Sequence, residues 1–273
     1  MPQHTYTRGH PLRQPGAVYP TPLHRRAAET LTSFFAGRPG VEAVLLIASC
    51  AHGKAVAQSD LDIAVLMEPV ALSQHGPDLE RHWEEAYQSD EVYAALRGVG
   101  SFTHIDVDLI DGQFEPAPRG WTGGPDAFEL EIGNSLAYSV PLWQRDAYLE
   151  QVRDRWLPYY SDALRRERLA AALRYCHNDL AHIPPYVERG LYFQAFDRLY
   201  HAYRGFLQAL FISRRTYPIA YDKWIREQVE ERLRLPELYR QLPRLFEIGH
   251  FESDEIGLKA DVLAGLVASY VEV

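Results

Sequence analysis

The sequence predicts an α/β domain followed by an all-α domain. In about the first half of the 273-residue chain, short apolar runs of strand length alternate with segments of helical periodicity. From residue 146 onward only helical patterns occur, rich in Leu, Ala, Arg, Tyr and Glu. A chain of this length can bury two ordinary cores. We therefore expect a flexible N-terminal arm at 1–20, a first domain at 21–145 and a helical domain at 146–273.

The composition excludes several classes of protein. Hydrophobic residues make up 47% of the chain and charged residues 24%, and no apolar run approaches the roughly 20 residues that span a bilayer. Residues 1–20 lack the apolar core of a secretory signal. The two cysteines, Cys50 and Cys176, lie far apart, so we expect no disulfide and a cytoplasmic location. The net charge of −9 disfavours nucleic-acid binding and favours cationic small substrates.

Each element of the first domain has a local signal. Thr21 can cap a helix that has Pro22 in its first turn, and apolar runs or strict alternation indicate strands. The expected helices are 21–36, 50–56, 77–97 with a break near 89–90, and 128–136; the expected strands are 41–48, 60–67, 102–110 and 137–144. Between them, residues 111–125 are Gly, Pro and polar, which suits a loop bordering a ligand cleft.

The helical domain is divided by prolines, which we expect to interrupt helices near Pro158, Pro184-Pro185, Pro218, Pro236 and Pro243. The expected helices are 146–181 with a break near 158, 189–214, 222–233, 236–247 and 253–271.

Two acidic pairs lie on expected strands. Asp60 and Asp62 are two residues apart, so both carboxylates leave the same face, roughly 7 Å apart at their Cα atoms. Asp106 and Asp108 repeat this pattern on a later strand. If the two strands are neighbours, three or four carboxylates meet in an arrangement suited to Mg²⁺. The alternative is a set of solvated carboxylates on an exposed edge strand.

The turn before the first acidic pair suits a phosphate. Ser49 opens the expected short helix at 50–56, and free N–H groups with a partial positive charge lie at a helix N-terminus. Here the chain resembles the polymerase-beta-like nucleotidyltransferase superfamily, whose minimal and antibiotic-modifying members read Gly-Ser-x-x-Arg-Gly and then Ser-Asp-x-Asp. Ser49 matches the family serine and Gly53 its second glycine, whereas Ala48 replaces the first glycine and His52 the arginine.

The resemblance implies a fold, a reaction and a set of site residues. It implies a small mixed β-sheet flanked by helices, then a helical bundle, and transfer of a nucleoside monophosphate from ATP or another nucleoside triphosphate with two Mg²⁺ ions. The acceptor would be a hydroxyl of a small, cationic molecule similar to an aminoglycoside or a lincosamide. The implied catalytic residues are Asp60, Asp62 and Asp106, the metal ligands are these with Asp108, and the nucleotide-binding residues are Ser49, Gly53, Ser59 and Lys223. Which of Asp106 and Asp108 is the third carboxylate stays open.

Three assignments have plain alternatives. Lys223 lies in a segment at 206–224 that resembles the helical domain of such enzymes, but a surface lysine would look the same. Asp126 and Glu129 are candidates to bind a cationic acceptor, although solvated carboxylates are favoured.

The competing function is a catalytically weak or inactive nucleotidyltransferase-like protein that acts as a binding or antitoxin-type partner. Ala48 favours it, and the long helical half disfavours it. Nucleotide addition to RNA ends is disfavoured because no basic surface is indicated. No membrane partner is expected, and an oligomer is left open.

Overall fold

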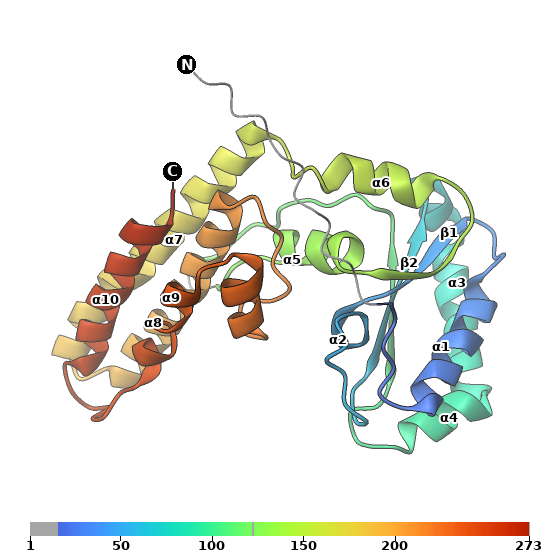
Figure 1. Cartoon of the computed structure of the whole chain (residues 1–273), viewed down its shortest axis with the longest axis horizontal. Coiled ribbons are helices and arrows are strands. Elements are labelled where there is room, and N and C mark those ends of the chain that lie inside the picture. Colours follow the sequence, from blue (N-terminus) through green and yellow to red (C-terminus); the bar gives the residue numbers. More distant parts are fainter. Residues whose placement is uncertain (1–15, 122, 273) are drawn as a thin grey trace. The chain divides into compact units, whose positions relative to one another are not determined.

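The computed structural model describes residues 16–121 and 123–272. Most of the expected N-terminal arm, residues 1–15, therefore lies outside the described residues. The chain divides into two compact units (Figure 1). The first contains the described residues up to Gln113 together with Tyr138–Val152, and the second contains the described residues of Phe114–Ala137 and Arg153–Val273.

A four-stranded mixed sheet forms the centre of the first unit. Its strands are β1 (Val41–Leu46), β2 (Leu61–Met67), β3 (Ile105–Ile110) and β4 (Val140–Gln144), in the order β3-β2-β1-β4. Strand β1 runs antiparallel to β2 and β4, whereas β2 and β3 are parallel. A parallel pair needs a crossover connection, and helices supply it here. The expected fold class, a small mixed sheet flanked by helices and followed by a helical region, is confirmed.

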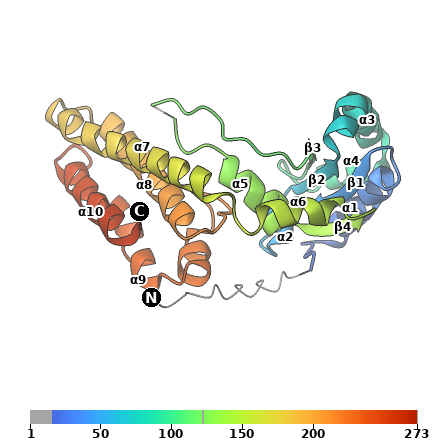
Figure 2. The same ribbon diagram turned by 90° about the horizontal axis from the view of Figure 1, so that it is seen from above.

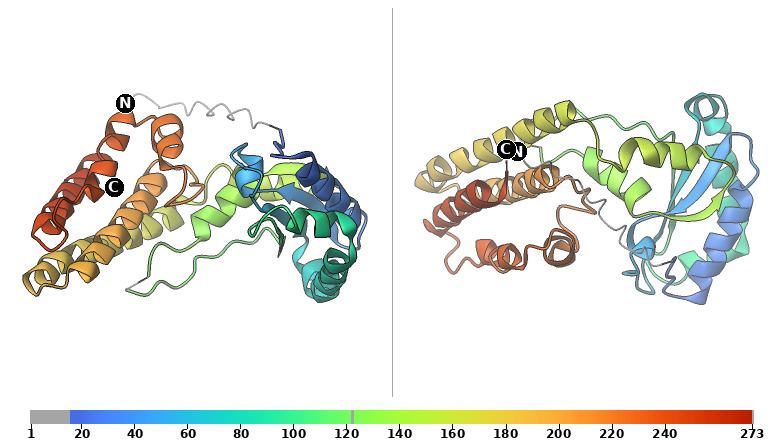
Figure 3. Two further views of the ribbon diagram at one scale, coloured as in Figure 1. Left: turned by 90° about the horizontal axis from the view of Figure 1, so that it is seen from below. Right: turned by 45° about the horizontal axis from the view of Figure 1, so that its top comes forward.

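One face of this sheet packs against helices (Figures 1 and 3). The helices are α1 (Pro22–Phe35), α3 (Pro69–Ser89) and α4 (Glu91–Arg97). Thr21 caps α1 by accepting the N–H of His24, as expected. The break between α3 and α4 falls at Asp90, whose side chain caps α4 by accepting the N–H of Val92.

Helix α3 begins earlier than the sequence predicts. It starts at Pro69 rather than Pro77, and Pro77 lies inside it. Proline is favoured in a first helical turn, and an interior proline removes one N–H donor. The core contacts of Leu79 and Trp83, both buried on this helix, outweigh that loss.

The second unit is helical apart from its loops. Its elements are α5 (Phe128–Ile132), a π-helix (Gly133–Ala137), α7 (Asp162–Glu188), α8 (Tyr192–Ser213), a second π-helix (Glu227–Arg232), α9 (Pro236–Tyr239), a 3₁₀ helix (Pro243–Phe246) and α10 (Glu255–Tyr270). Helices α7 and α8 form an antiparallel pair with α10 beside them (Figure 2). Helix α6 (Tyr148–Trp156) contains residues of both units, and the expected break near Pro158 separates it from α7.

The expected interruption at Pro184-Pro185 is wrong, because α7 continues through both prolines to Glu188. They lie in its last turns, where few further backbone hydrogen bonds are lost. The neighbouring Ile183 is fully buried, so packing holds this part of the helix in place.

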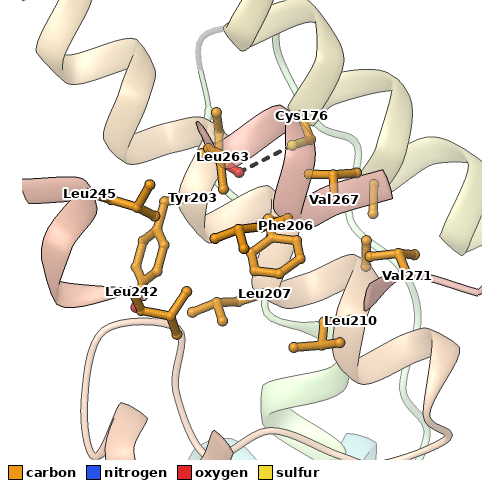
Figure 4. Close-up of a cluster of buried hydrophobic side chains, with 14 of the residues drawn as sticks. Cys176, Tyr203, Phe206, Leu207, Leu210, Leu242, Leu245, Leu263, Val267 and Val271 are labelled. Atoms are coloured by element: carbon orange, nitrogen blue, oxygen red, sulfur yellow. Dashed lines mark hydrogen bonds between the residues drawn. The ribbon is translucent and has the colours of Figure 1, made fainter. Parts of the chain in front are cut away.

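The core of the second unit gathers apolar side chains from α7, α8 and α10 (Figure 4). Cys176 lies in this core, with its thiol 3.3 Å from the carbonyl oxygen of Ala202. Cys50 is buried in the first unit, and both cysteines are free, as expected. Burial raises the pKa of the Cys50 thiol to about 11 and that of Cys176 to about 12, so both behave as small apolar residues.

Residues 114–137 pack with the second unit, although the sequence placed them in the first domain. Asp126 and Glu129 both form ion pairs with Arg168 of α7, and such long-range pairs have no local sequence signal. At the other end, Val18 donates its backbone N–H to the carbonyl oxygen of Cys50, so the described end of the expected arm is attached to the first unit. Among residues 16–121 and 123–272, no helix is both long and apolar enough to cross a membrane.

Candidate functional site

The turn between β1 and β2 is tighter than expected. Its helix, α2 (Ala48–Ala51), is a single turn, whereas the sequence predicted a helix at 50–56. It ends early because Gly53 adopts a left-handed backbone with φ of 65°, and the N–H of Lys54 then donates to the carbonyl oxygen of Ser49 at 2.9 Å. In this structure Gly53 therefore shapes the turn, and its predicted contact with a nucleotide stays a prediction.

Ala48 has a left-handed backbone with φ of 50°, at the position where the resembling family has glycine. An L-residue pays roughly 1–2 kcal/mol for this conformation, mainly because its Cβ approaches the following carbonyl. The local backbone is thus one that glycine adopts without strain.

We expect Ala48→Gly to stabilise the protein by about 0.5–1 kcal/mol, because relief of the left-handed strain exceeds the roughly 0.4–1 kcal/mol cost of greater chain freedom in the unfolded state. Urea unfolding measures this free energy. The matched control is Ala51→Gly, in the same helical turn without a positive φ, which should destabilise by about 0.5–1 kcal/mol. Equal destabilisation by both substitutions would contradict the explanation.

The two predicted nucleotide-binding serines differ in their contacts. The Ser49 Oγ is buried, and its hydroxyl interacts with the neighbouring Cys50 thiol, which lowers the pKa of that thiol against the larger effect of burial. Ser59 Oγ accepts the backbone N–H of Val56 at 2.9 Å and so closes the turn. The predicted contacts of both serines with a nucleotide stay predictions.

Two carboxylates and one imidazole meet where β2 and β3 begin. Asp60, His104 and Asp106 each bring one ligand atom to within 4.8 Å of the other two. Leu61 lies opposite Ile105 in the parallel register, which places the residues just before the two strands side by side. The Nε2 atom of His104 is 3.1 Å from Oδ2 of Asp106. Oxygen and imidazole ligands of this kind suit a divalent cation.

The other two predicted metal ligands lie outside this group. Asp62 is the Cα partner of Asp106 across the two strands, and Asp108 is the partner of Ala64, farther along the sheet. Strand β3 is an edge strand, and the side chain of Asp106 is 54% exposed. Of the two candidates for the third carboxylate, only Asp106 belongs to the group with Asp60.

The sequence analysis missed two histidines. His104 lies two residues before Asp106, and this spacing was a usable signal because it puts both side chains on one face. His24 is fully buried, with Nε2 3.0 Å from the carbonyl oxygen of Ser59 and Nδ1 2.8 Å from the Thr21 hydroxyl. A carbonyl only accepts, so Nε2 carries the proton and Nδ1 accepts from the hydroxyl. His24 thereby holds Ser59, the residue next to Asp60, and no feature of the sequence indicates this contact.

The imidazole of His104 should affect which divalent metal ion the site prefers. We expect the site to bind Mn²⁺ more tightly than Mg²⁺, because Mg²⁺ prefers oxygen ligands alone. His104→Ala should weaken Mn²⁺ binding by about tenfold, equivalent to ~1.4 kcal/mol, and change Mg²⁺ binding much less. Electron paramagnetic resonance of Mn²⁺ measures the first affinity, and competition with Mg²⁺ the second. His177→Ala, which removes an exposed histidine from α7, is the control; tighter binding of Mg²⁺ than Mn²⁺ in the native protein would contradict the expectation.

The remaining predicted residues lie in the second unit. Lys223 is exposed, and its carbonyl oxygen accepts from the Gln228 side chain at 2.8 Å; its predicted contact with a nucleotide stays a prediction. Asp126 and Glu129 were favoured as solvated carboxylates, and this is wrong, because both are buried and paired with Arg168. The same ion pairs leave neither carboxylate free to bind a cationic acceptor.

Comparison with known proteins adds little to this geometry. No family model matches the sequence, and no curated protein matches it. Among solved structures, a nucleotidyltransferase-like protein from Exiguobacterium sibiricum 255-15 aligns with a TM-score of 0.44 and 13% sequence identity, over 90% of this chain and 74% of that chain. A likeness of this degree carries no argument about function, which rests on the residues of the site.

Proposed function

We propose that the protein is a metal-dependent nucleotidyltransferase that moves AMP from ATP to a hydroxyl of a small molecule. The observation that supports this most is the meeting of Asp60 and Asp106, far apart in sequence, with His104 at the start of two neighbouring strands. The turn that carries Ser49 adjoins the same place, since the Cys50 thiol lies 3.9 Å from the carbonyl oxygen of Asp60. Carboxylates and a phosphate-binding turn are the parts that such a transfer needs.

Each residue has a role in the proposal. Asp60, Asp62 and Asp106 would hold two Mg²⁺ ions, with His104 as a further ligand. Bound metal would neutralise the charge of the triphosphate and polarise the attacking hydroxyl. Ser49 would donate its hydroxyl hydrogen to a phosphate oxygen, and Lys223 would contact the triphosphate. Asp106, or else Asp108, would accept the proton of the attacking hydroxyl.

The acceptor in the proposal is a cationic, hydroxylated molecule such as an aminoglycoside or a lincosamide. The formal net charge of −9 supports a cationic acceptor through long-range attraction. We place the reaction in the cytoplasm, where ATP is available, and the two free, buried cysteines fit a reducing compartment.

The test is calorimetric titration of ATP, with and without Mg²⁺, into the native protein and into an Asp60→Ala, Asp62→Ala double variant. Binding that requires Mg²⁺ and is lost in the variant would support the proposal. If ATP binds to neither protein, the proposal is wrong. Transfer of radiolabel from ATP to a panel of hydroxylated compounds then identifies the acceptor, and failure with every aminoglycoside removes that class alone.

A second function is a catalytically inactive protein that binds a partner. The left-handed Ala48 favours it, since its methyl group stands in a turn that the resembling enzymes build with glycine. Metal binding without any Mg²⁺-dependent ATP binding, in both the native protein and the Ala48→Gly variant, would select this alternative.

A further inference from the structure

A pocket of about 200 Å³ is lined only by residues of the second unit. Residues of the loop before α5, including Pro116 and Arg119, form one wall, and α7 and α8 form the others. Figure 2 shows this loop running beside α7. The sequence analysis expected residues 111–125 to border a ligand cleft, and the loop does line a pocket.

The loop is held by hydrogen bonds, so the pocket is already formed. The Tyr175 hydroxyl donates to the carbonyl oxygen of Arg119 at 2.7 Å, and Arg198 donates to that of Trp121 at 3.0 Å. At the end of the loop, Arg168 donates to both carboxylate oxygens of Asp126. A ligand would therefore bind without ordering this backbone first, which favours affinity.

Two carboxylates line the pocket: Glu167 is exposed to solvent, and Asp126 is fully engaged together with the nearby Glu129. Arg168 donates to Asp126 and to Glu129, and the Gln208 amide nitrogen donates to each of them at 3.1 Å. The Tyr160 hydroxyl also donates to Glu129, at 2.8 Å. Because its nitrogen is committed, Gln208 turns its amide oxygen toward Arg119. Asp126 and Glu129 are thus neutralised by other donors.

Arg119 is a cation with too few acceptors. Its Nε donates to the carbonyl oxygen of Gly123, and its Nη1 is 3.4 Å from the Gln208 oxygen. Its Nη2 is buried without a hydrogen-bond partner, and no carboxylate of the described residues forms an ion pair with it. Burial lowers the pKa of Arg119, which reflects this loss of solvation. Each unmet donor of a buried charge costs free energy that an added acceptor would recover.

A second cation stands close by. The guanidinium carbon of Arg119 is 4.3 Å from the centre of the Tyr175 ring, and that of Arg174 is 5.9 Å from the same centre. Arg119 thus lies against the Tyr175 ring and is one of the residues that line the pocket, and the end of its guanidinium retains the unmet Nη2 donor. A guanidinium binds carboxylate or phosphate oxygens through paired N–H donors.

We propose that this pocket binds a small organic anion, whose carboxylate or phosphate group pairs with Arg119 and whose short apolar part lies against Pro116, Ala117 and Leu164. The volume of about 200 Å³ falls below the roughly 300–1,000 Å³ that is typical of ligand pockets, which favours a small ligand. The inference is independent of the nucleotidyl transfer proposed for the first unit.

Calorimetric titration of the full-length protein with benzoate and with inorganic phosphate tests the proposal and distinguishes the two anionic groups. Binding of either supports it. Arg119→Gln should weaken that binding at least tenfold, because it removes the charge and the paired donors. The matched control is Arg240→Gln, which removes an exposed arginine of the same unit and should leave affinity unchanged. Circular dichroism checks that each variant is folded.

Ala171→Phe gives a second variant that keeps every charge. Ala171 lines the pocket from α7, so a phenyl group there occupies the space and should abolish binding of the same anion. This variant decides the matter if Arg119→Gln fails to fold. The proposal is overturned if neither anion binds the native protein, if Ala171→Phe or folded Arg119→Gln binds as tightly as the native protein, or if Arg240→Gln loses affinity equally.

Discussion

Arg168→Met is expected to destabilise the protein by about 3–5 kcal/mol. The variant would leave Glu129, whose side chain is 0% exposed, and Asp126, at 9%, as buried carboxylates without a cation. Removing one partner of a buried ion pair costs more than the pair itself contributes, because the remaining charge stays desolvated. Urea unfolding followed by circular dichroism measures the loss.

Two comparisons distinguish the cost of leaving buried carboxylates without a cation from a general effect of removing an arginine. Arg240→Met removes an arginine whose ion pair with Glu237 is exposed, and it should cost less than about 1 kcal/mol. Adding Glu129→Gln to Arg168→Met should recover part of the loss, since a neutral amide is cheaper to bury than a carboxylate. A cost below 1 kcal/mol for Arg168→Met would mean that water reaches the two carboxylates.

Asp106→Asn should reduce nucleotidyl transfer by roughly a thousandfold, or about 4 kcal/mol, if the acidic group holds the catalytic metal. An amide keeps the shape of the carboxylate but lacks its charge. The same variant should lose most of its Mn²⁺ affinity in a calorimetric titration, a measurement that needs no knowledge of the acceptor.

Asp108→Asn is the matched control for this prediction. Asp108 lies on the same exposed strand two residues farther on, and it does not belong to the group formed by Asp60, His104 and Asp106. Its substitution should leave Mn²⁺ affinity nearly unchanged. Equal losses of Mn²⁺ affinity in the two variants would mean that the strand contributes only its overall charge. A loss of affinity in Asp108→Asn alone would mean that the metal binds near Asp108, farther along the sheet.

The local part of the site could be predicted from the sequence. An apolar run predicted the strand that carries Asp62, period-two alternation predicted the strand that carries Asp106, and the small residues from Ser49 onward indicated a turn. The sequence did not predict that β2 and β3 are neighbours, and the meeting of the carboxylates was expected only if they were. Strand order could not be predicted because it depends on contacts between distant segments. The role of His24 could not be predicted for the same reason, because its contact with Ser59 spans 35 residues of sequence.

The predicted helix boundaries are wrong where side-chain packing outweighs the local conformational preference of proline. Proline signals misplaced the start of α3 at Pro77 and placed a break at Pro184-Pro185, because burial of Trp83 and Ile183 maintains the helix on each side. The partners of Asp126 and Glu129 could not be predicted either. A carboxylate near the start of a short helix looks solvated until the distant arginine that neutralises it is known.

The assignment of residues 114–137 to the second unit has a practical consequence for dividing the protein. The chain passes between the units at residues 113–114, 137–138 and 152–153, so neither unit is one continuous stretch. A fragment that begins at residue 146 would keep Arg168 but lose both of the carboxylates that bind it. A helical fragment suitable for separate study would instead contain 114–137 and 153–273, with a flexible linker in place of residues 138–152.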